Sequence, residues 1–327
     1  MKVLVTGGTG FTGAHLSRRL LERGHDVEVI DTQPGLFFDE LRERGAQLHL
    51  GSVTDPELVD RAIDGCEVVY HLAAMFRRVN APKSAYLDVN VAGTRLLAQA
   101  AQRHGVRSFV NCSTQGVHGH IAQTPGDENS PIAPEDYYQY TKYEGERVLS
   151  EFAGQGMSVV TIRPTAIYGP GDPERFLMLF KRVRKGRFLM FGKGTVHYHP
   201  VYIDNLVDAF ELAAESEDGH GESYLVGDDR YYTLNDLVRA IAKSLDVELT
   251  VQYLPFWPLW VSAVACEALY KPLPADPPLF RRRIDWFRQN RAFSIDKARG
   301  QLGYEPKVGL DEGLARTAAW YLEEGYL

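Results

Sequence analysis

Near its N-terminus the chain reads Val5-Thr6-Gly7-Gly8-Thr9-Gly10-Phe11-Thr12-Gly13. The apolar run before this segment predicts a strand, and the amphipathic pattern after it predicts a helix. In that setting Gly8, Gly10 and Gly13 satisfy the dinucleotide-binding pattern G-x-G-x-x-G. Glycines at these places permit a tight turn, a close backbone approach to a pyrophosphate and close packing of helix on strand. The segment therefore predicts a dinucleotide site at the N-terminus of the first helix.

The first half of the chain alternates short apolar runs with amphipathic stretches, which is typical of βαβ units and a parallel sheet. We expect strands at Val3–Thr6, Val27–Asp31, Gln47–Leu50, Val68–His71, Phe109–Cys112 and Val159–Arg163. We expect helices at Phe11–Arg23, Phe38–Gly45, Glu57–Ile63, Ala85–His104 and Tyr138–Phe152. The sequence thus predicts an α/β fold with a doubly wound, parallel Rossmann sheet.

The pattern changes after Pro164, because Pro and Gly cluster in RPTAIYGPGDP (residues 163–173) and no βαβ rhythm follows. We expect a nucleotide-binding Rossmann domain over residues 1–165, to which residues 200–215 return. Residues 166–327 are expected to form a smaller C-terminal substrate-binding lobe.

Composition excludes several classes of protein. The 327 residues are 44% hydrophobic with a net charge of −7, so no basic footprint for nucleic acid is expected. Three cysteines are too few for a disulfide framework or a metal cage and fit a reduced cytoplasm. The apolar segment 254–265 is too short to span a bilayer. It predicts either a packed helix or lid, or a contact with a membrane surface.

An acid, Asp31, stands where the second predicted strand ends. In dinucleotide-binding folds an acid at this place hydrogen-bonds the ribose hydroxyls of the adenosine. Thr32 and Gln33 follow it, with no adjacent Arg to pair with a 2′-phosphate. Asp is also common in turns at strand ends. Combined with the glycine pattern, Asp31 favours NAD over NADP.

Tyr138 and Lys142 are four residues apart, so on a helix they share one face. A phenol with a pKa near 10 is a poor base at neutral pH, but an ammonium and the positive nicotinamide ring favour the phenolate. Tyr138 would then move a proton on or off a substrate hydroxyl while hydride moves to or from the cofactor. Ser113 and Thr114 follow the fifth predicted strand, at the edge where such sheets bind ligands. Each pair alone also fits ordinary helix and loop residues, whereas together they indicate a catalytic set.

These residues together resemble the extended short-chain dehydrogenases, the NAD-dependent epimerase/dehydratase family. The resemblance covers nearly the whole chain. His71-Leu72-Ala73-Ala74 is similar to the family's fourth-strand motif, Asn90-Val91 and Gly93-Thr94 to its following helix, and RPTAIYGP (residues 163–170) to its sixth-strand signature.

The resemblance implies roles for individual residues. The catalytic residues would be Thr114, Tyr138 and Lys142. NAD would contact Gly7, Gly10, Phe11, Thr12, Gly13, Asp31, Ser52, Val53, Leu72, Ala73, Ala74, Asn90, Cys112, Tyr138, Lys142, Pro164 and Ile167. The substrate, a small molecule, would contact Ser113, Thr114, Tyr138, Thr165, His197, Arg282 and Arg283. No metal is implied.

Three positions depart from the family's patterns. Ser52 stands where the family often has an acid that binds adenine, so backbone and Val53 would carry that contact. Sugar-nucleotide dehydratases place Asp-Glu after the catalytic Thr, whereas this chain has Gln115-Gly116, which argues against a dehydratase. Sugar-nucleotide epimerases usually have an Arg seven residues before the position of Asp204, to reach the substrate diphosphate; here that residue is His197.

Residues 254–283 look more like the 3β-hydroxysteroid dehydrogenase branch, which has an apolar cap over a flat substrate. The run Arg281–Arg283 fits either a diphosphate site, since Arg presents a fork suited to phosphate oxygens, or a solvated basic face. The resemblance also implies a homodimer through the helices at 85–104 and 138–152, with apolar surface from Leu96, Leu97 and Ala100.

Three hypotheses about function follow. The first is a nucleotide-sugar epimerase with permanently bound NAD, which acts through a 4-keto intermediate of the sugar. The second is a net dehydrogenase or reductase of a bulky apolar alcohol such as a 3β-hydroxysteroid. The third is a non-catalytic NAD-sensing protein, which would have no need of the Ser/Thr, Tyr and Lys set. The sequence favours the first.

Overall fold

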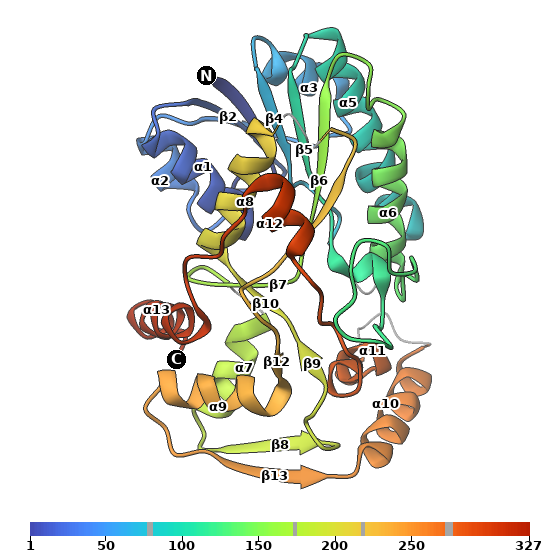
Figure 1. The fold of residues 1–327 in the computed structure, drawn as a ribbon, viewed down its shortest axis with the longest axis vertical. Helices are drawn as coiled ribbons and strands as arrows, with labels where there is room; N and C mark the ends of the chain where they lie inside the picture. Colours follow the sequence, from blue (N-terminus) through green and yellow to red (C-terminus); the bar gives the residue numbers. More distant parts are fainter. Residues whose placement is uncertain (77–80, 173–174, 217–219, 272–276) are drawn as a thin grey trace.

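The structure, a computed structural model, describes residues 1–76, 81–172, 175–216, 220–271 and 277–327. Seven strands form the main sheet: β1 Lys2–Thr6, β2 Asp26–Asp31, β3 Gln47–Leu50, β4 Val68–His71, β5 Ser108–Cys112, β6 Ser158–Pro164 and β11 Ser223–Val226. Their order is β11-β6-β5-β4-β1-β2-β3, and every pair is parallel (Figure 1). The order reverses between β1 and β4, the place where Rossmann folds bind ligands.

The Rossmann fold predicted from the sequence is confirmed. All six expected strands form, and their bounds agree within one residue. Helices cover both faces of the sheet (Figure 1). One apolar core joins the sheet to α1 Phe11–Glu22, α8 Ile203–Glu215 and α12 Asp296–Leu302. Another lies under α3 Pro56–Ile63, α5 Thr94–Arg103 and α6 Tyr137–Ser150. Burial on both faces explains why the strands are apolar throughout.

The helix expected at Ala85–His104 is not regular. It consists of α4 Lys83–Leu87, a π-helical turn η1 Asp88–Gly93, and α5. A Cβ on Gly93 would lie 2.9 Å from Val53 Cγ2, so this turn packs tightly against the β3–α3 loop. Such a turn carries one extra residue, and π-turns are frequent at functional sites. The apolar period of the sequence does not reveal it.

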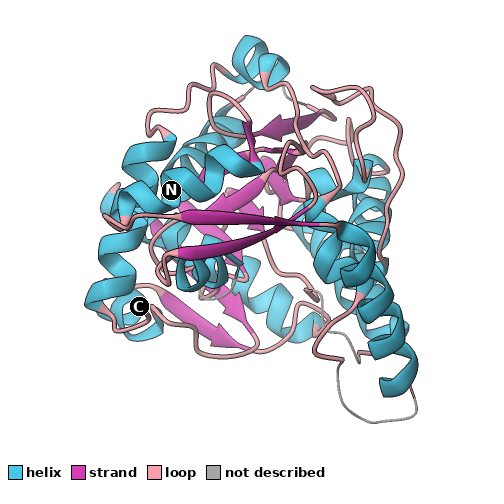
Figure 2. Ribbon diagram, turned by 90° about the horizontal axis from the view of Figure 1, so that it is seen from below, coloured by secondary structure: helices cyan, strands magenta, loops and turns pink. Residues whose placement is uncertain are grey.

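The second half of the molecule has its own apolar core. Its paired short strands are β7 Ala166–Tyr168 with β10 Pro200–Tyr202, β9 His197–Tyr198 with β12 Tyr232–Thr233, and β8 Arg187–Phe191 with β13 Thr250–Leu254. Seen from below, β8 and β13 run across the near side of this half (Figure 2). The remaining helices are α2 Phe38–Glu43, η2 Gln115–His118, α7 Arg175–Val183, α9 Leu234–Ser244, α10 Phe256–Tyr270, α11 Arg281–Ile284, η3 Asp285–Phe287 and α13 Leu310–Glu323.

The chain returns to the Rossmann half more than once. α8 covers β5 and β6, as expected for residues 200–215. β11 also joins the sheet beside β6, and α12 packs against β11 and α8. Both come from the part of the chain that we expected in the second lobe. The sheet is thus completed by late segments, whereas the exact division into 1–165 and 166–327 stays a prediction.

The apolar face proposed for a dimer contact is largely used inside the chain. Leu97 and Ala100 are fully buried in the core between α5 and the sheet, and Leu96 packs against its edge. The homodimer therefore stays a prediction that rests on the family resemblance. Among the described residues, no helix is long and apolar enough to cross a bilayer, and no group of three or more potential metal ligands occurs.

Candidate active site

The glycine loop lies where the sheet order reverses. Gly7 has φ +69°, and a Cβ there would lie 2.8 Å from the backbone nitrogen of Ala73 at the end of β4. A Cβ on Gly13 would lie 2.1 Å from the carbonyl oxygen of Gly7. Gly10 caps α1 without any side chain to bind the first amides of the helix. The amides of Phe11 and Thr12 therefore face the loop as donors, which fits a pyrophosphate.

Asp31 fastens this loop to β2. Its carboxylate accepts hydrogen bonds from the backbone nitrogens of Thr9 at 3.1 Å and Thr32 at 2.8 Å. The carboxylate is partly exposed, and each oxygen keeps a lone pair for ribose hydroxyls. Gly35, which was not predicted as part of the site, packs so closely that a Cβ would lie 1.7 Å from the Thr9 carbonyl oxygen. Its only signal is the turn dipeptide Pro34-Gly35.

The predicted adenine contacts lie on the neighbouring loops. The Ser52 hydroxyl bonds the hydroxyl of Thr54 at 2.8 Å and accepts from its backbone nitrogen. Val53 is buried, whereas Leu72, Ala73 and Ala74 at the end of β4 are partly exposed. These five residues line the same edge of the sheet as the glycine loop, and their contacts with NAD stay predictions.

A buried hydrogen-bonded chain links β1, β4 and α5. The Thr94 hydroxyl donates to the Asn90 carbonyl oxygen at 2.9 Å, so it accepts from Nε2 of His71. Nδ1 of His71 then accepts from the Thr6 hydroxyl at 2.8 Å. Complete burial, with the charge of Lys142 nearby, lowers the pKa of His71 to about 3. The imidazole is therefore neutral, and it sets the position of the β4 end by hydrogen bonding.

Asn90, predicted to touch NAD, holds protein segments together. Its side-chain oxygen accepts from the Met75 backbone nitrogen at 2.8 Å, and its amide donates to the Met75 carbonyl oxygen and the Thr141 hydroxyl. The π-turn places Asn90 against α6, since a Cβ on Gly145 would lie 2.7 Å from the Asn90 carbonyl oxygen. Asn90 thus joins the loop after β4 to the helix that carries Tyr138 and Lys142.

The predicted catalytic residues come from two neighbouring elements. Tyr138 and Lys142 lie in the first turns of α6, which begins with a capping box of Asp136 and Gln139. Both side chains are buried, and the ring of Tyr138 meets the exposed ring of Phe76 edge-on at 5.0 Å. Thr114 follows β5 and caps η2, where its hydroxyl accepts from the Gly116 nitrogen at 3.1 Å. Its own proton stays available for a substrate oxygen.

Lys142 is placed for a ligand. Burial lowers the pKa of its ammonium, and the negative charge of Glu146 opposes that shift. An ammonium has three donor hydrogens, so a ligand that brings hydroxyl oxygens fits this position. The glycine loop, Asp31 and Lys142 together supply hydrogen-bonding groups that a dinucleotide requires.

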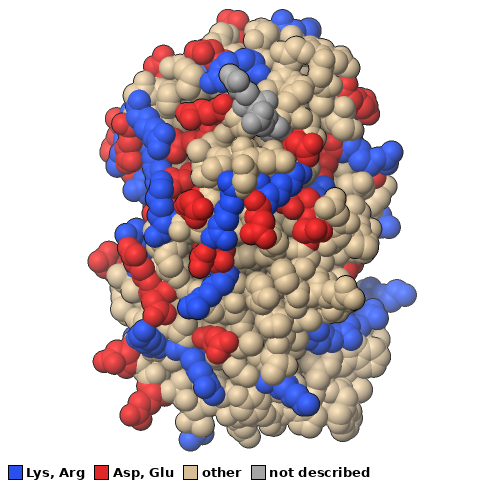
Figure 3. Space-filling view, in the orientation of Figure 1, with Lys and Arg blue, Asp and Glu red and all other residues tan. Residues whose placement is uncertain are grey.

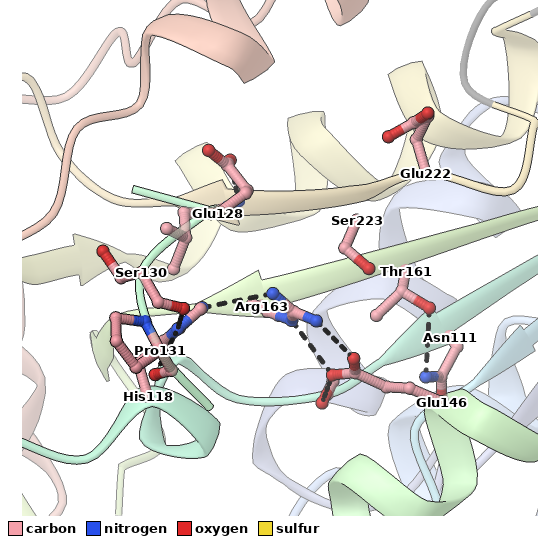
Figure 4. Close-up of polar contacts among 12 residues, drawn as sticks. Asn111, His118, Glu128, Ser130, Pro131, Glu146, Thr161, Arg163, Glu222 and Ser223 are labelled. Atoms are coloured by element: carbon pink, nitrogen blue, oxygen red, sulfur yellow. Dashed lines mark hydrogen bonds and ion pairs between the residues drawn. The ribbon is translucent and has the colours of Figure 1, made fainter. Parts of the chain in front are cut away.

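A buried polar network adjoins the predicted catalytic residues (Figure 4). The Ser113 hydroxyl donates to Glu146, whose carboxylate accepts from Arg163 Nη2 at 2.6 Å and Nε at 3.1 Å. On its other side Arg163 contacts Nε2 of His118 at 3.1 Å, and Nδ1 of His118 donates to the Ser130 carbonyl oxygen. Arg163 lies between Glu146 and His118 in the close-up. Ser113, predicted to touch substrate, is thus engaged by Glu146.

The role of Glu146 was not predicted from the sequence. It lies four residues after Lys142, on the same helix face, and this spacing was its available signal. The network ties together the end of β5, the middle of α6 and the end of β6. It fixes Thr114, which follows Ser113, relative to Pro164, which follows Arg163.

Two buried oxygens at this edge have no partner among the described residues, namely Thr165 Oγ1 and Gln115 Oε1. Thr165 follows β6 and was predicted to contact substrate, and its orphaned hydroxyl fits that prediction. Pro164 is buried and Ile167 partly exposed in β7. Burial raises the pKa of the Cys112 thiol to about 11, so Cys112 stays protonated and supplies only packing to a cofactor.

The proposed diphosphate contacts are separate from this cluster. His197 lies in β9, where its Nδ1 is 3.4 Å from the Thr124 hydroxyl and its ring meets Tyr231 edge-on. The backbone of Arg282 and Arg283 forms α11, but their side chains lie outside the described part of the chain. Their contact with substrate therefore stays a prediction.

Residues 3–227 match the NAD dependent epimerase/dehydratase family. Among curated proteins, the chain is 31% identical to the 2-alkyl-3-oxoalkanoate reductase of Stenotrophomonas maltophilia, over 98% of this chain and 99% of that protein. It is 31% identical to a 3 beta-hydroxysteroid dehydrogenase/Delta 5-->4-isomerase of Mycobacterium tuberculosis, over 98% and 90%. It is 30% identical to the N-acetyl-alpha-D-glucosaminyl-diphospho-ditrans,octacis-undecaprenol 4-epimerase of Escherichia coli, over 96% and 93%.

A solved structure of the same fold also matches this chain. The UDP-glucose 4-epimerase of Thermotoga maritima, solved with UDP-glucose, superposes with a TM-score of 0.80 at 27% identity and covers 99% of both chains. The matched family is NAD-dependent, and the cofactor predicted from the sequence is thereby confirmed. The family match also confirms the prediction that the protein is an enzyme.

Proposed function

Because this chain belongs to the NAD-dependent epimerase/dehydratase family, we propose that it is a net dehydrogenase or reductase of a bulky, apolar secondary alcohol or ketone. NAD supplies the hydride acceptor or donor. Tyr138 exchanges a proton with the reacting oxygen through its phenol, and Thr114 donates a hydrogen bond to the same oxygen. Lys142 holds ribose hydroxyls, and its charge favours the phenolate of Tyr138.

The proposed substrate class rests on one observation, the pairing of arginines in the second lobe with carboxylates. Arg281 is paired with Glu267 at 2.8 Å, Arg288 with Asp285 at 2.8 Å, and Arg291 with Glu135 at 3.2 Å. A substrate diphosphate needs cations that are not already neutralised. Every arginine side chain described between residues 281 and 291 already has a carboxylate partner, which favours a substrate without a diphosphate.

Three further observations support this proposal. His197 occupies the place of the epimerases' arginine and is engaged by Thr124 and Tyr231. Tyr138 packs against the exposed, apolar ring of Phe76. The two relatives at 31% identity are named for a 2-alkyl-3-oxoalkanoate, a carboxylate with alkyl chains, and for a 3β-hydroxysteroid, and neither name includes a diphosphate. The order of the candidate functions therefore differs from the one that the sequence favours.

The second candidate is the sugar epimerase. Its support is the relative named for an undecaprenol-linked amino sugar and the fold shared with UDP-glucose 4-epimerase. An epimerase returns its hydride to the same substrate, so it has no need to exchange NAD. A net dehydrogenase exchanges NAD in every turnover.

This difference gives the test. Purified protein is denatured and the released NAD is quantified. The protein is then assayed with a 3β-hydroxysteroid plus NAD, with a 2-alkyl-3-oxoalkanoate plus NADH, and with UDP-glucose without added cofactor. We expect an empty protein that needs added cofactor in amounts equal to product. Stoichiometric bound NAD with epimerisation of UDP-glucose would reverse the order of the two candidates.

A further inference from the structure

The helix α10 is apolar, but many of its side chains are exposed. Of its fifteen residues, only Ala263 is buried. Trp257 is 69% exposed, Val261 50% and Leu269 72%. A helix that is apolar on all sides normally lies inside a protein or in contact with lipid. α10 projects at the lower corner of the molecule, away from the main sheet (Figure 1).

The exposed side chains form one continuous face. At 100° per residue, Trp257, Trp260, Val261, Ala265 and Ala268 fall on one side of the helix. The charged residue of α10, Glu267, lies at the edge of this face beside Trp260, and its charge is paired with Arg281. Large exposed apolar patches usually mark interaction sites.

Positive charge adjoins this face. Residues 254–291 contain six Lys or Arg and three Asp or Glu, a net charge of +3 in a chain whose total is −7. Lys271 follows α10 at its C-terminal end and is exposed. Arg288 lies over the ring of Phe256 at 5.6 Å. In the space-filling view the corner formed by α10 is uncharged (Figure 3).

We propose that α10 is a docking surface for an anionic membrane. Fifteen residues make a helix of about 22 Å, shorter than the roughly 30 Å hydrocarbon core. The helix therefore lies in the interface and does not cross the bilayer. Trp rings favour the headgroup level, Val and Leu enter the acyl boundary, and the exposed Lys271 at the end of α10 binds anionic headgroups.

A second copy of the chain fits this surface less well. Symmetric contacts bring the same patch of both copies together, so the basic residues beside α10 would face their own equivalents. A bilayer that contains anionic lipid matches both the apolar face and its charge. This inference concerns binding and does not depend on the proposed activity.

The surface is also connected to the candidate active site. After η3 the chain continues to Gln289, which donates to Glu135 at 2.8 Å, and to Arg291, which pairs with the same carboxylate. Glu135 lies three residues before Tyr138. A protein bound through α10 would thus hold its second lobe against the lipid surface, where apolar substrates reside.

The test is flotation of the purified full chain with vesicles. Vesicles of phosphatidylcholine alone are compared with vesicles that contain equal amounts of phosphatidylcholine and phosphatidylglycerol. We expect binding to the anionic vesicles, lowered at least about tenfold by the double substitution W257S and L269S. K271Q should weaken binding about fivefold, as should salt at about 0.5 M.

The matched control is L322S, since Leu322 lies on α13 and is 51% exposed. It should float like the unchanged protein. Equal flotation of W257S/L269S and the unchanged protein would refute the assignment of the surface. No flotation, with a dimer in sedimentation that W257S/L269S abolishes, would reassign it to a contact between copies.

A second measurement covers the case in which the double variant fails to fold. Tryptophan emission of the unchanged protein should be quenched by vesicles that contain brominated phosphatidylcholine, because Trp257 and Trp260 enter the interface. W257F, a conservative change at an exposed position, should lose part of this quenching. Emission that is insensitive to brominated lipid would overturn the proposal.

Discussion

The buried pair Glu146–Arg163 allows a quantitative prediction for the variant R163M. Both side chains are only 7% exposed, and Glu146 also accepts from Ser113. Removal of the arginine leaves a buried carboxylate without its cation, which costs about 3–5 kcal/mol. Unfolding of 327 residues changes entropy by about 0.7 kcal/mol per kelvin. The melting temperature of R163M should therefore fall by about 4–7 °C.

Two variants make the measurement decisive. In E146Q/R163M neither charge remains, so the double variant should melt above R163M. R95M breaks the ion pair of Arg95 with Glu151, whose side chains are 39% and 55% exposed. An exposed pair contributes about 1 kcal/mol at most, so R95M should shift the melting temperature by about 1.5 °C or less. Melting temperatures are read by circular dichroism. If R163M melts like R95M, the network does not hold the strand ends together.

Four further results are expected. Y138F should lower turnover ~10²-fold or more with NAD affinity and melting temperature nearly unchanged, because the ring still packs but transfers no proton; wild-type turnover would contradict the assignment. D31A should weaken NAD binding and reduce the preference for NAD over NADP, measured as the ratio of the Kd values for the two cofactors. An unchanged ratio would exclude a role of Asp31 in binding the adenosine ribose. Burial raises the pKa of Asp228 to about 7, so the folded state binds the extra proton and stability falls as pH rises from about 4 to 7. D228N should flatten that fall in urea titrations, by up to about 1.4 kcal/mol per pH unit, and an unchanged slope would show that Asp228 is ionised throughout. Light scattering at micromolar concentration should give a homodimer, and a monomer would refute it.

Much of the Rossmann half could be predicted because its signals are local. Apolar runs between amphipathic stretches give the six strands, and the glycine spacing gives the first loop. The π-turn at Asp88–Gly93 could not be predicted in this way. It depends on the close approach of Gly93 to Val53 and of Gly145 to Asn90, contacts between segments far apart in the chain. Periodicity along the sequence carries no information about such contacts.

The same distinction applies to the candidate site. Thr114, Tyr138 and Lys142 belong to motifs with fixed spacing, so the sequence singles them out. Ser113 and Asn90 have polar side chains of a kind that also binds ligands, and only the structure shows their bonds to Glu146 and Met75. The second lobe has no repeating unit, and its short strand pairs join segments that are distant in sequence. Its interpretation from sequence was accordingly limited to family resemblance.

The late arrival of β11 has a consequence for synthesis of the protein. β6 ends at Pro164, but its partner strand begins only at Ser223. A ribosome that adds about 5–20 residues per second needs several seconds to cover that interval. During this time β6, a long buried strand of the finished sheet, is an unpaired edge strand, which invites pairing with other chains. Shielding by chaperones should matter most in this interval, and a fragment that ends before β11 should aggregate where the full chain does not.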